Sequence, residues 1–576
     1  MKYVLLTLFF VLMRCTSSFA AVERWLFVDG HSDYDIVVAP EASVSELKAA
    51  ADLKDYLKLV GNVEVAISRS LNGTGSHIYI GYNARVASLT GAEKPDDSDE
   101  QFVWCTVGDD FCIYGGRQRG TMYGVYRFIA KYLGVRWYTK DFTKVPRFTS
   151  LEMPNIKGGE KPAFRYRHLF YYTSRIHHDW DAHNCLNSTF GDVISNSYGD
   201  MQSYWDVHTM GKLISSAEFF KSHPEFFSMR KGRRIGDGQL CLSNPRVVAL
   251  LKNRVLEMIK TRSGHWCYSV SQNDNQNFCE CEKCKLLERR YGGHAGLLLW
   301  AINQIADTVG TVYPGIYIGT LAYHYTQTPP SNIKPRNNVV IRLCNIESCF
   351  SHPINAQENS KMMRDFSGWL KLTNHVFWWE YATNFYHYLL PFPNFHAISD
   401  NLRILSDAKI TGVMIEGQYE KYGGEFYEIK QWLLAQLLWN PYQNVDSLAE
   451  EFIRDYYGVV ANSIAEFYRL TNQLVNEDHH LMFTTDFNSY IFTDDYIFAA
   501  RKLLDGALKK VRGDSALLAR VEQLRVMVLY LQANRYPSKA HVNGSKEGLT
   551  DFFRKYDWNV REGEDHKVLI KKMDYW

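Results

Sequence analysis

The sequence predicts an α/β protein with a (β/α)8 TIM-like barrel, a small α/β domain before it and a helical domain after it. The chain has 576 residues, enough for several domains of ordinary size. Short apolar runs alternate with helical stretches over residues 159–440, as expected for parallel strands with crossover helices. After residue 440 helical periodicity dominates, so residues 441–576 are expected to form the helical domain.

Residues 21–158 are expected to form the small α/β domain. Ser43 and Glu46 form a capping-box pattern ahead of a helical repeat. Two strands, joined by a two-residue turn containing glycine, predict a hairpin in which Cys105 faces Cys112. Either a disulfide or two separate buried thiols would fit this pairing.

The barrel region contains a series of apolar runs of strand length. The expected strands are residues 164–169, 226–229, 266–271, 316–323, 339–343, 375–380 and 412–416. Residues 183–209 are too irregular to place a second strand. Four helices are expected beyond the barrel, at residues 445–457, 463–476, 494–511 and 516–536.

Residues 1–20 are typical of a signal peptide: Lys2 precedes an apolar run, and small residues flank the end of the segment. The run is too short for a permanent membrane span. We therefore expect an exported protein, periplasmic or extracellular. A lipoprotein anchored through Cys15 is the alternative, although Arg14 stands where a lipobox needs a small residue.

Composition argues against nucleic-acid binding, because the net charge is only +2 and no basic stripe is present. Aromatic residues make up 14% of the chain. They suit stacking on sugars, but large cores also bury Trp and Tyr.

Four acids stand at expected strand ends: Asp274, Glu347, Glu380 and Glu416. A barrel brings such positions to one face, where catalytic groups collect. Glycoside hydrolysis needs two carboxyl groups, one of them kept protonated. Alternatively, each acid is a surface or ion-paired residue. Aromatic residues near these acids are candidates for substrate binding, together with Glu380 and Glu416: Trp378, Trp379, Tyr381, Tyr323 and Tyr419.

Cysteines 279, 281 and 284 form a Cys-x-Cys-x-x-Cys pattern. Structural zinc normally takes four ligands, and the segment holds only three. Cys267, Cys344 or Cys349 could supply a fourth through space, but export favours disulfides instead. We therefore expect no metal and no cofactor.

Two stretches of the chain resemble known glycosidase domains. Residues 115–126 and 134–138 resemble the non-catalytic domain that precedes the barrel in α-glucuronidases and β-hexosaminidases. From Pro162 to about Gly458 the chain resembles a barrel family of Bacteroidetes, long catalogued as a domain of unknown function, from which glycoside hydrolase family 163 was founded. The supporting motifs are Ser-Gln-Asn-Asp at 271–274, Leu-Ala-Tyr at 321–323, Pro-Phe-Pro at 391–393, Leu-Leu-Trp-Asn-Pro at 437–441 and Tyr-Tyr-Gly at 456–458.

This resemblance implies a retaining endo-β-N-acetylglucosaminidase that cleaves N-glycans, with the substrate acetamide as nucleophile. In related hexosaminidases an Asp-Glu pair after the fourth strand orients the acetamide and donates the proton. Asn273 and Asp274 occupy that place here, with Glu347 as the substitute acid, so these three are the expected catalytic residues. The expected partner is an oligosaccharide or glycoprotein glycan. The competing hypotheses are a glycan-binding protein without catalysis and a glycosidase of other specificity.

Overall fold

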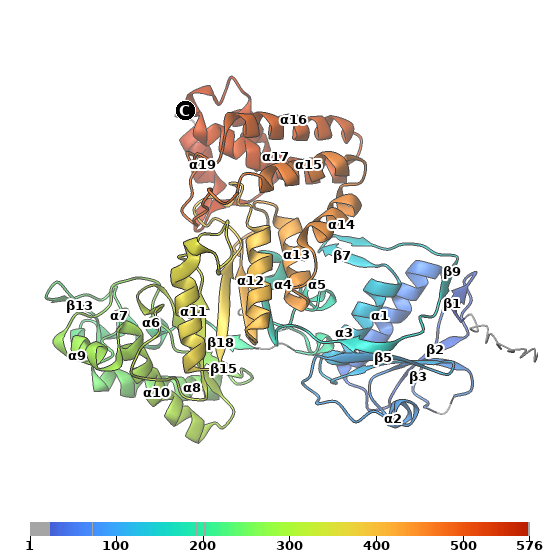
Figure 1. The fold of residues 1–576 in the computed structure, drawn as a ribbon, viewed down its shortest axis with the longest axis horizontal. Coiled ribbons are helices and arrows are strands. Elements are labelled where there is room, and N and C mark those ends of the chain that lie inside the picture. Colours follow the sequence, from blue (N-terminus) through green and yellow to red (C-terminus); the bar gives the residue numbers. More distant parts are fainter. Residues whose placement is uncertain (1–23, 72, 190–193, 201–202, 574–576) are drawn as a thin grey trace, which may run out of the picture.

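The computed structural model describes residues 24–71, 73–189, 194–200 and 203–573. The predicted signal peptide lies outside these residues. Figure 1 shows an N-terminal α/β part in blue, a central part with the parallel sheet in green to yellow, and C-terminal helices in orange and red. Among the described residues, no helix is both long and apolar enough to cross a membrane.

The N-terminal part is built on a six-stranded mixed sheet of order β10-β5-β6-β4-β2-β3. Helix α1 (Val44–Gly61) begins with the expected capping box, in which Ser43 and Glu46 bond each other's backbone. Helices α1 and α3 (Gly120–Tyr132) pack against each other and the sheet. The strands are β2 (Tyr34–Val38), β3 (Ile67–Ser68), β4 (Ser76–Ile80), β5 (Phe102–Val107), β6 (Asp110–Gly115) and β10 (Lys157–Glu160).

The predicted hairpin register is confirmed. Strands β5 and β6 pair antiparallel, and Cys105 is the partner of Cys112. Both cysteines are buried free thiols in the structure, so of the two interpretations it shows separate thiols.

The central part contains a curled sheet of seven strands that pair in parallel. Its order is β11-β19-β18-β17-β16-β15-β12. Most of its strands are buried along their whole length and read as continuous apolar runs, as expected for a parallel sheet covered on both faces. The strands are β11 (Tyr166–Phe170), β12 (Tyr204–Trp205), β15 (Cys267–Ser269), β16 (Tyr317–Ala322), β17 (Val339–Cys344), β18 (Val376–Tyr381) and β19 (Gly412–Glu416).

Side chains from both edges of this sheet meet on its inner face. The Tyr166 ring of β11 lies 6.3 Å from the Tyr204 ring of β12. The Arg342 guanidinium of β17 lies 3.7 Å above the Tyr204 ring, at cation–π distance. Gly319 of β16 leaves room for that ring, because a Cβ there would lie 1.9 Å from the Tyr204 hydroxyl. The sheet therefore curls far enough to enclose a core.

The closed barrel that the sequence predicts is matched only in part. Strands β11 and β12 are the two edges of the order. A single parallel bridge joins His168 of β11 to Ser188, in the region where no second strand could be placed from sequence. The described residues thus form a curled parallel sheet rather than a demonstrated eight-stranded barrel.

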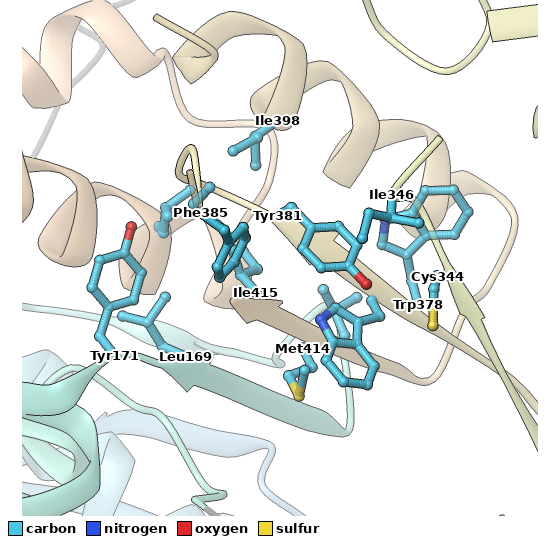
Figure 2. Packing of buried hydrophobic residues seen from close by; sticks show 14 of the residues in the cluster. Leu169, Tyr171, Cys344, Ile346, Trp378, Tyr381, Phe385, Ile398, Met414 and Ile415 are labelled. Carbon is cyan, nitrogen blue, oxygen red and sulfur yellow. The ribbon is translucent and has the colours of Figure 1, made fainter. Parts of the chain in front are cut away.

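Helices pack on the outer face of the sheet and cover it (Figure 1). Figure 2 shows Ile398 from a covering helix on one side of the sheet and Met414 of β19 pointing to the opposite side. The principal helices are α8 (Pro245–Thr261), α9 (Glu282–Tyr291), α10 (His294–Val312), α11 (Ser360–Leu372), α12 (Phe395–Asp407) and α13 (Tyr427–Trp439).

One expected barrel strand, residues 226–229, is wrong. Pro224–Phe226 is a 3-10 turn, and β13 (Met229–Arg230) pairs only with β14 (Arg233–Arg234) in a small hairpin. Pro224 fixes its own φ and lacks an N–H, which favours the turn. The backbone of this segment instead bonds the loop before α8, where Cys241 N–H donates to Phe226 O at 2.8 Å.

The C-terminal part contains the four expected helices: α14 (Val445–Tyr457), α15 (Ala461–Asn472), α16 (Asp494–Lys510) and α17 (Ser515–Arg535). It is not wholly helical. After α18 (Ser545–Lys555) the chain forms a hairpin of β20 (Asn559–Arg561) and β21 (Glu564–Asp565), followed by α19 (His566–Met573). This hairpin reaches the central part, because Tyr388 N–H donates to Val560 O at 2.9 Å.

Candidate active site

A cavity of about 1090 Å³ opens at the carboxyl ends of the parallel strands. Residues in or following all seven strands contribute to its wall, as does the C-terminal hairpin. Its polar and charged lining includes Asp206, His208, Lys212, Arg262, Asp274, Glu416, Arg561 and Glu562, and its aromatic lining includes Phe170, Trp205, Tyr323, Trp379, Tyr381, Tyr386 and Tyr419.

Glu416, the last residue of β19, is a buried carboxyl group that faces this cavity. The indole N–H of Trp379 donates to its Oε2 at 2.9 Å. Burial, the nearby Glu562 and, to a smaller extent, Asp274 together raise the pKa of Glu416 to about 8. The Trp379 hydrogen bond opposes these effects. Glu416 therefore holds a proton at neutral pH.

Asp274 stands beyond the end of β15, on the cavity wall. The Tyr323 hydroxyl donates to its Oδ1 at 2.9 Å. Burial and the adjacent Asp274 carboxyl raise the pKa of Tyr323, so the phenol keeps the proton that it donates. This hydrogen bond from Tyr323 fixes the orientation of the Asp274 carboxyl group.

A third carboxyl group comes from the C-terminal hairpin. Glu562 lies in the turn between β20 and β21 and lines the cavity. It accepts a hydrogen bond of 2.6 Å from the hydroxyl of Tyr419, and its backbone N–H donates to Phe385 O at 2.9 Å. Burial raises the pKa of Glu562, and the hydrogen bond from Tyr419 opposes that effect.

Strand β18 sends alternate side chains to opposite faces of the sheet, as a pleated strand must. Trp379 and Tyr381 line the cavity, with ring planes 18° apart and centroids separated by 5.9 Å. Trp378 and Glu380 point outward. Trp378 packs on Phe366 of α11, and Glu380 accepts a hydrogen bond from Asn401 of α12 at 2.9 Å.

Glu380 is therefore not placed to bind a substrate in the cavity. Besides Asn401, it accepts hydrogen bonds from the Asn345 amide, the Trp378 indole and the Tyr381 backbone, at 2.8 to 3.1 Å. Burial raises its pKa, and these donors oppose that effect. Glu380 is a fully hydrogen-bonded buried group between the sheet and its helices.

Glu347 and Asn273 also lie outside the cavity lining. Glu347 bonds His324 at 3.1 Å, and this contact lowers the pKa of Glu347, whereas a proton donor needs a raised one. The Asn273 amide is committed to backbone: its Oδ1 accepts from Gly211 N–H at 2.8 Å and its Nδ2 donates to Gly238 O at 2.9 Å. The structure thus brings Asp274 and Glu416 together, but not Glu347, Glu380 or Asn273.

Of the aromatic residues expected at the site, Trp378 alone is outside the cavity lining; Trp379, Tyr381, Tyr323 and Tyr419 belong to it. Tyr419 stacks on Phe170 with centroids 4.5 Å apart. Sequence reasoning missed Glu562, since it sits in a short charged turn far along the chain. It also missed Trp205, the last residue of β12, and His208, which follows β12 in the irregular region.

A family model matches the central part of the chain. The model of the family described as "Domain of unknown function (DUF4838)" matches residues 137–469, more than half of the chain. No curated protein matches the sequence.

Solved structures give a likeness of fold. The family GH115 4-O-methyl-α-glucuronidase BtGH115A, with specificity for decorated arabinogalactans, superposes with a TM-score of 0.61 and 10% identity, covering 92% of this chain and 77% of the other. CpGH84B gives a TM-score of 0.47 and 12% identity over 94% of this chain and 93% of its own. At such identities only the fold is shared, and the first match carries that conclusion.

Proposed function

This chain belongs to the DUF4838 family, and we propose that it is a glycoside hydrolase whose proton donor is Glu416. The placement of Glu416 carries the proposal: it is a buried carboxyl group at a strand end, facing a large cavity beside two further carboxyl groups. The shared fold with a GH115 α-glucuronidase supports it. Fold alone does not fix function, so the site has to provide the argument.

Glu416 meets the requirements of a general acid. Cleavage of a glycosidic bond needs a proton on the leaving oxygen, from a carboxyl group that is protonated at the working pH. Burial and the neighbouring carboxyl groups raise the pKa of Glu416 to about 8. The Trp379 indole bonds Oε2 and so leaves Oε1 as the oxygen that can carry the proton toward the cavity.

Asp274 is proposed to assist the nucleophile, whereas Glu416 assists the leaving group. In the proposed reaction the carbonyl oxygen of the substrate's 2-acetamido group attacks the anomeric carbon, while the glycosidic oxygen leaves with the proton of Glu416. Asp274 accepts a hydrogen bond from the acetamide N–H and stabilises the positive charge that develops there. Its own orientation is fixed by the Tyr323 hydroxyl. This mechanism is the one implied by the sequence resemblance, with the acid moved from Glu347 to Glu416.

The size of the cavity supports an oligosaccharide substrate. At about 1090 Å³ it slightly exceeds the volume of typical ligand pockets, roughly 300–1,000 Å³. Trp379, Tyr381 and Tyr419 offer aromatic faces along its wall, which suit the apolar faces of sugar rings. We therefore propose an exported, retaining endo-β-N-acetylglucosaminidase that acts on N-glycans, in a barrel of which the curled sheet forms seven strands.

A glycan-binding protein without catalysis is the second candidate. One observation favours it: the residue before Asp274 is an amide, Asn273, whose side chain is wholly engaged with backbone. A binding protein would need the aromatic walls but not the proton on Glu416.

Digestion of defined glycans separates these candidates. Purified protein is incubated with a glycoprotein carrying complex N-glycans, and released glycans are identified by mass spectrometry. We expect an oligosaccharide with one N-acetylglucosamine at its reducing end, and none from the Glu416→Gln variant. Binding of the glycan without release would support the second candidate. Release of glucuronic acid from an arabinogalactan, but nothing from N-glycans, would contradict the proposed specificity while leaving a glycosidase.

A further inference from the structure

Four cysteine sulfur atoms converge at one point outside the cavity. Cys241, Cys279, Cys281 and Cys284 place their Sγ atoms within 4.8 Å of one another. Cys241 belongs to the loop before α8, Cys279 to the loop after β15, and Cys281 and Cys284 to the start of α9. All four are free thiols, and all except Cys281 are buried.

The spacing of these sulfurs is that of ligands around a single ion. Zinc binds thiolates at about 2.3 Å in a tetrahedron, so two ligand sulfurs stand about 3.8 Å apart. Cys241 Sγ lies 3.7 Å from Cys281 Sγ and 3.8 Å from Cys284 Sγ. A disulfide would single out one partner at about 2.0 Å, whereas Cys241 is equally distant from two. An iron–sulfur cluster, with several atoms between its thiolates, would hold them farther apart.

Polar groups around the sulfurs suit thiolates. The backbone N–H of Met229 donates to Cys279 Sγ at 3.3 Å, and the Arg234 guanidinium donates to the same atom at 3.6 Å. The Ser243 hydroxyl lies 3.6 Å from Cys281 Sγ and 3.1 Å from Cys284 Sγ. Four thiolates and one divalent cation leave a net charge of −2, which the Arg234 cation partly offsets. Such outer contacts orient the ligands of metal sites.

We propose that Cys241, Cys279, Cys281 and Cys284 bind one structural zinc ion. With four protein ligands the coordination is closed, so the ion has no position for a substrate and is not catalytic. This assignment is independent of the proposed function.

The ion would also brace the loop that carries Asp274. Gln239, close to Cys241, accepts from the Asn273 backbone N–H at 2.9 Å, and its own amide donates to the carbonyls of Asn273 and Asn275 at 2.8 and 2.7 Å. The zinc ligands join the same two segments, the loop before α8 and the loop after β15, at a point C-terminal to Asp274. The loop that carries Asp274 is thus fixed on one side by the hydrogen bonds of Gln239 and on the other by the zinc ligands. This positioning role, unlike the zinc site, rests on the proposed function.

Metal analysis of the full-length protein tests the site. Inductively coupled plasma mass spectrometry should find about one zinc per chain in the wild-type protein. The control variant Cys112→Ser, which alters a buried cysteine of the N-terminal sheet, should bind the same amount. Cys241→Ser and Cys284→Ser should lose the zinc and melt at lower temperature. Iron in place of zinc, or no metal together with an intact mass lowered by two hydrogens per disulfide, would overturn the assignment.

Cobalt gives a readout that does not depend on the variants folding. Wild-type protein, stripped of metal and refolded with Co²⁺, should show thiolate-to-cobalt charge-transfer bands and the intense visible bands of tetrahedral cobalt. Absence of these bands in refolded protein contradicts a four-thiolate site. For the bracing role, metal-depleted enzyme should lose kcat more than glycan affinity; equal kcat with and without metal contradicts that role. If no glycan is cleaved at all, the proposed function fails while the metal and cobalt results still decide the zinc site.

Discussion

Glu380 and Glu416 are both buried acids at the ends of neighbouring strands, yet they face different surroundings. In the β18–β19 register Glu380 pairs with Ile415 and Tyr381 with Glu416, so the two acids sit on opposite faces of the pleat. Glu380 accepts four hydrogen bonds on the helix-covered face. Glu416 accepts one from Trp379 and faces the cavity, where other carboxyl groups stand near it.

The difference shows that burial alone does not make a carboxyl group reactive. Burial raises the pKa of both acids. The donors around Glu380 leave it no access to a substrate, whereas Glu416 keeps a free oxygen at the cavity. A shift of one residue along β18 would turn Glu380 toward the cavity, since successive side chains point to opposite faces.

Replacement of each acid by its amide gives the largest contrast. Glu416→Gln should reduce kcat on a natural glycan by about 10²–10⁴-fold, the range of a positioned general acid, with the fold unchanged. Glu380→Gln should leave kcat within a few-fold but lower the free energy of unfolding by about 1–3 kcal/mol, because an amide N–H would meet the donors that now bond a carboxyl oxygen. Steady-state kinetics and urea unfolding measure the two effects. Equal kinetic losses would break the comparison.

Asp274→Asn should have the next largest effect, a loss of about 10²-fold in kcat with little change in KM. The variant keeps the shape of the side chain and removes the charge that stabilises the acetamide in the transition state. The matched control is Asp307→Asn, on the exposed end of α10, where Asp307 pairs with Arg336. Kinetics on the same glycan measure both. If Asp274→Asn raised KM alone, Asp274 would be a binding residue only.

The pH dependence follows from Glu416. As a proton donor it is active when protonated, so kcat should fall as pH rises through about 8. The same raised pKa makes the folded state bind more protons than the unfolded state at intermediate pH. Its contribution to stability is full below the ordinary glutamate pKa and is lost as pH rises to about 8. Glu416→Gln should therefore melt at a higher temperature than wild type at alkaline pH, a difference that calorimetry detects and that disappears at acid pH.

Glu562→Gln should move the alkaline limb of the kcat profile to lower pH. Glu562 raises the pKa of Glu416, and the amide removes that charge while keeping the contact with Tyr419. Glu547→Gln, on the exposed surface of α18, serves as the control with an equal change of net charge. A limb that moves to higher pH, or equally in both variants, would mean that Glu562 does not act on the donor.

Trp379→Phe should give the smallest effect, a shift of the alkaline limb of the kcat profile to higher pH. The Trp379 indole lowers the pKa of Glu416, and phenylalanine retains an aromatic face without the N–H donor. The pH profiles of Glu562→Gln and Trp379→Phe, measured side by side, should therefore shift in opposite directions. A downward shift for Trp379→Phe would contradict the role of this hydrogen bond.

Sequence reasoning predicted the parallel strands well because fully buried strands read as continuous apolar runs. Strand β19 has the predicted bounds, and β16, β17 and β18 differ from prediction by a residue or so at either end. It could not predict the second barrel position, where Ser188 makes a single bridge and no apolar run exists. The irregular segment there also supplies Trp205 and His208 to the cavity.

The site was harder to predict than the fold for two physical reasons. The apolar runs predict where the strands end, but the face that each strand-end acid occupies depends on the pleat, so the sequence does not distinguish Glu380 from Glu416. Contacts between distant segments leave no local pattern: Glu562 reaches the cavity from the last hairpin, and Cys241 reaches Cys281 and Cys284 from a loop far upstream. The fourth cysteine that the structure adds to the Cys-x-Cys-x-x-Cys pattern is Cys241, and not Cys267, Cys344 or Cys349.

The most direct test of the central claim, that Glu416 donates the proton, compares two leaving groups in the Glu416→Gln variant. One substrate is a natural glycan, whose leaving oxygen needs a proton; the other is the same oligosaccharide, ending in one N-acetylglucosamine that carries a dinitrophenyl leaving group, which departs without a proton. We predict that the variant loses about 10²–10⁴-fold in kcat on the glycan but keeps near wild-type formation of product from the activated substrate. Equal losses on both substrates, or no loss on the glycan, would contradict the assignment.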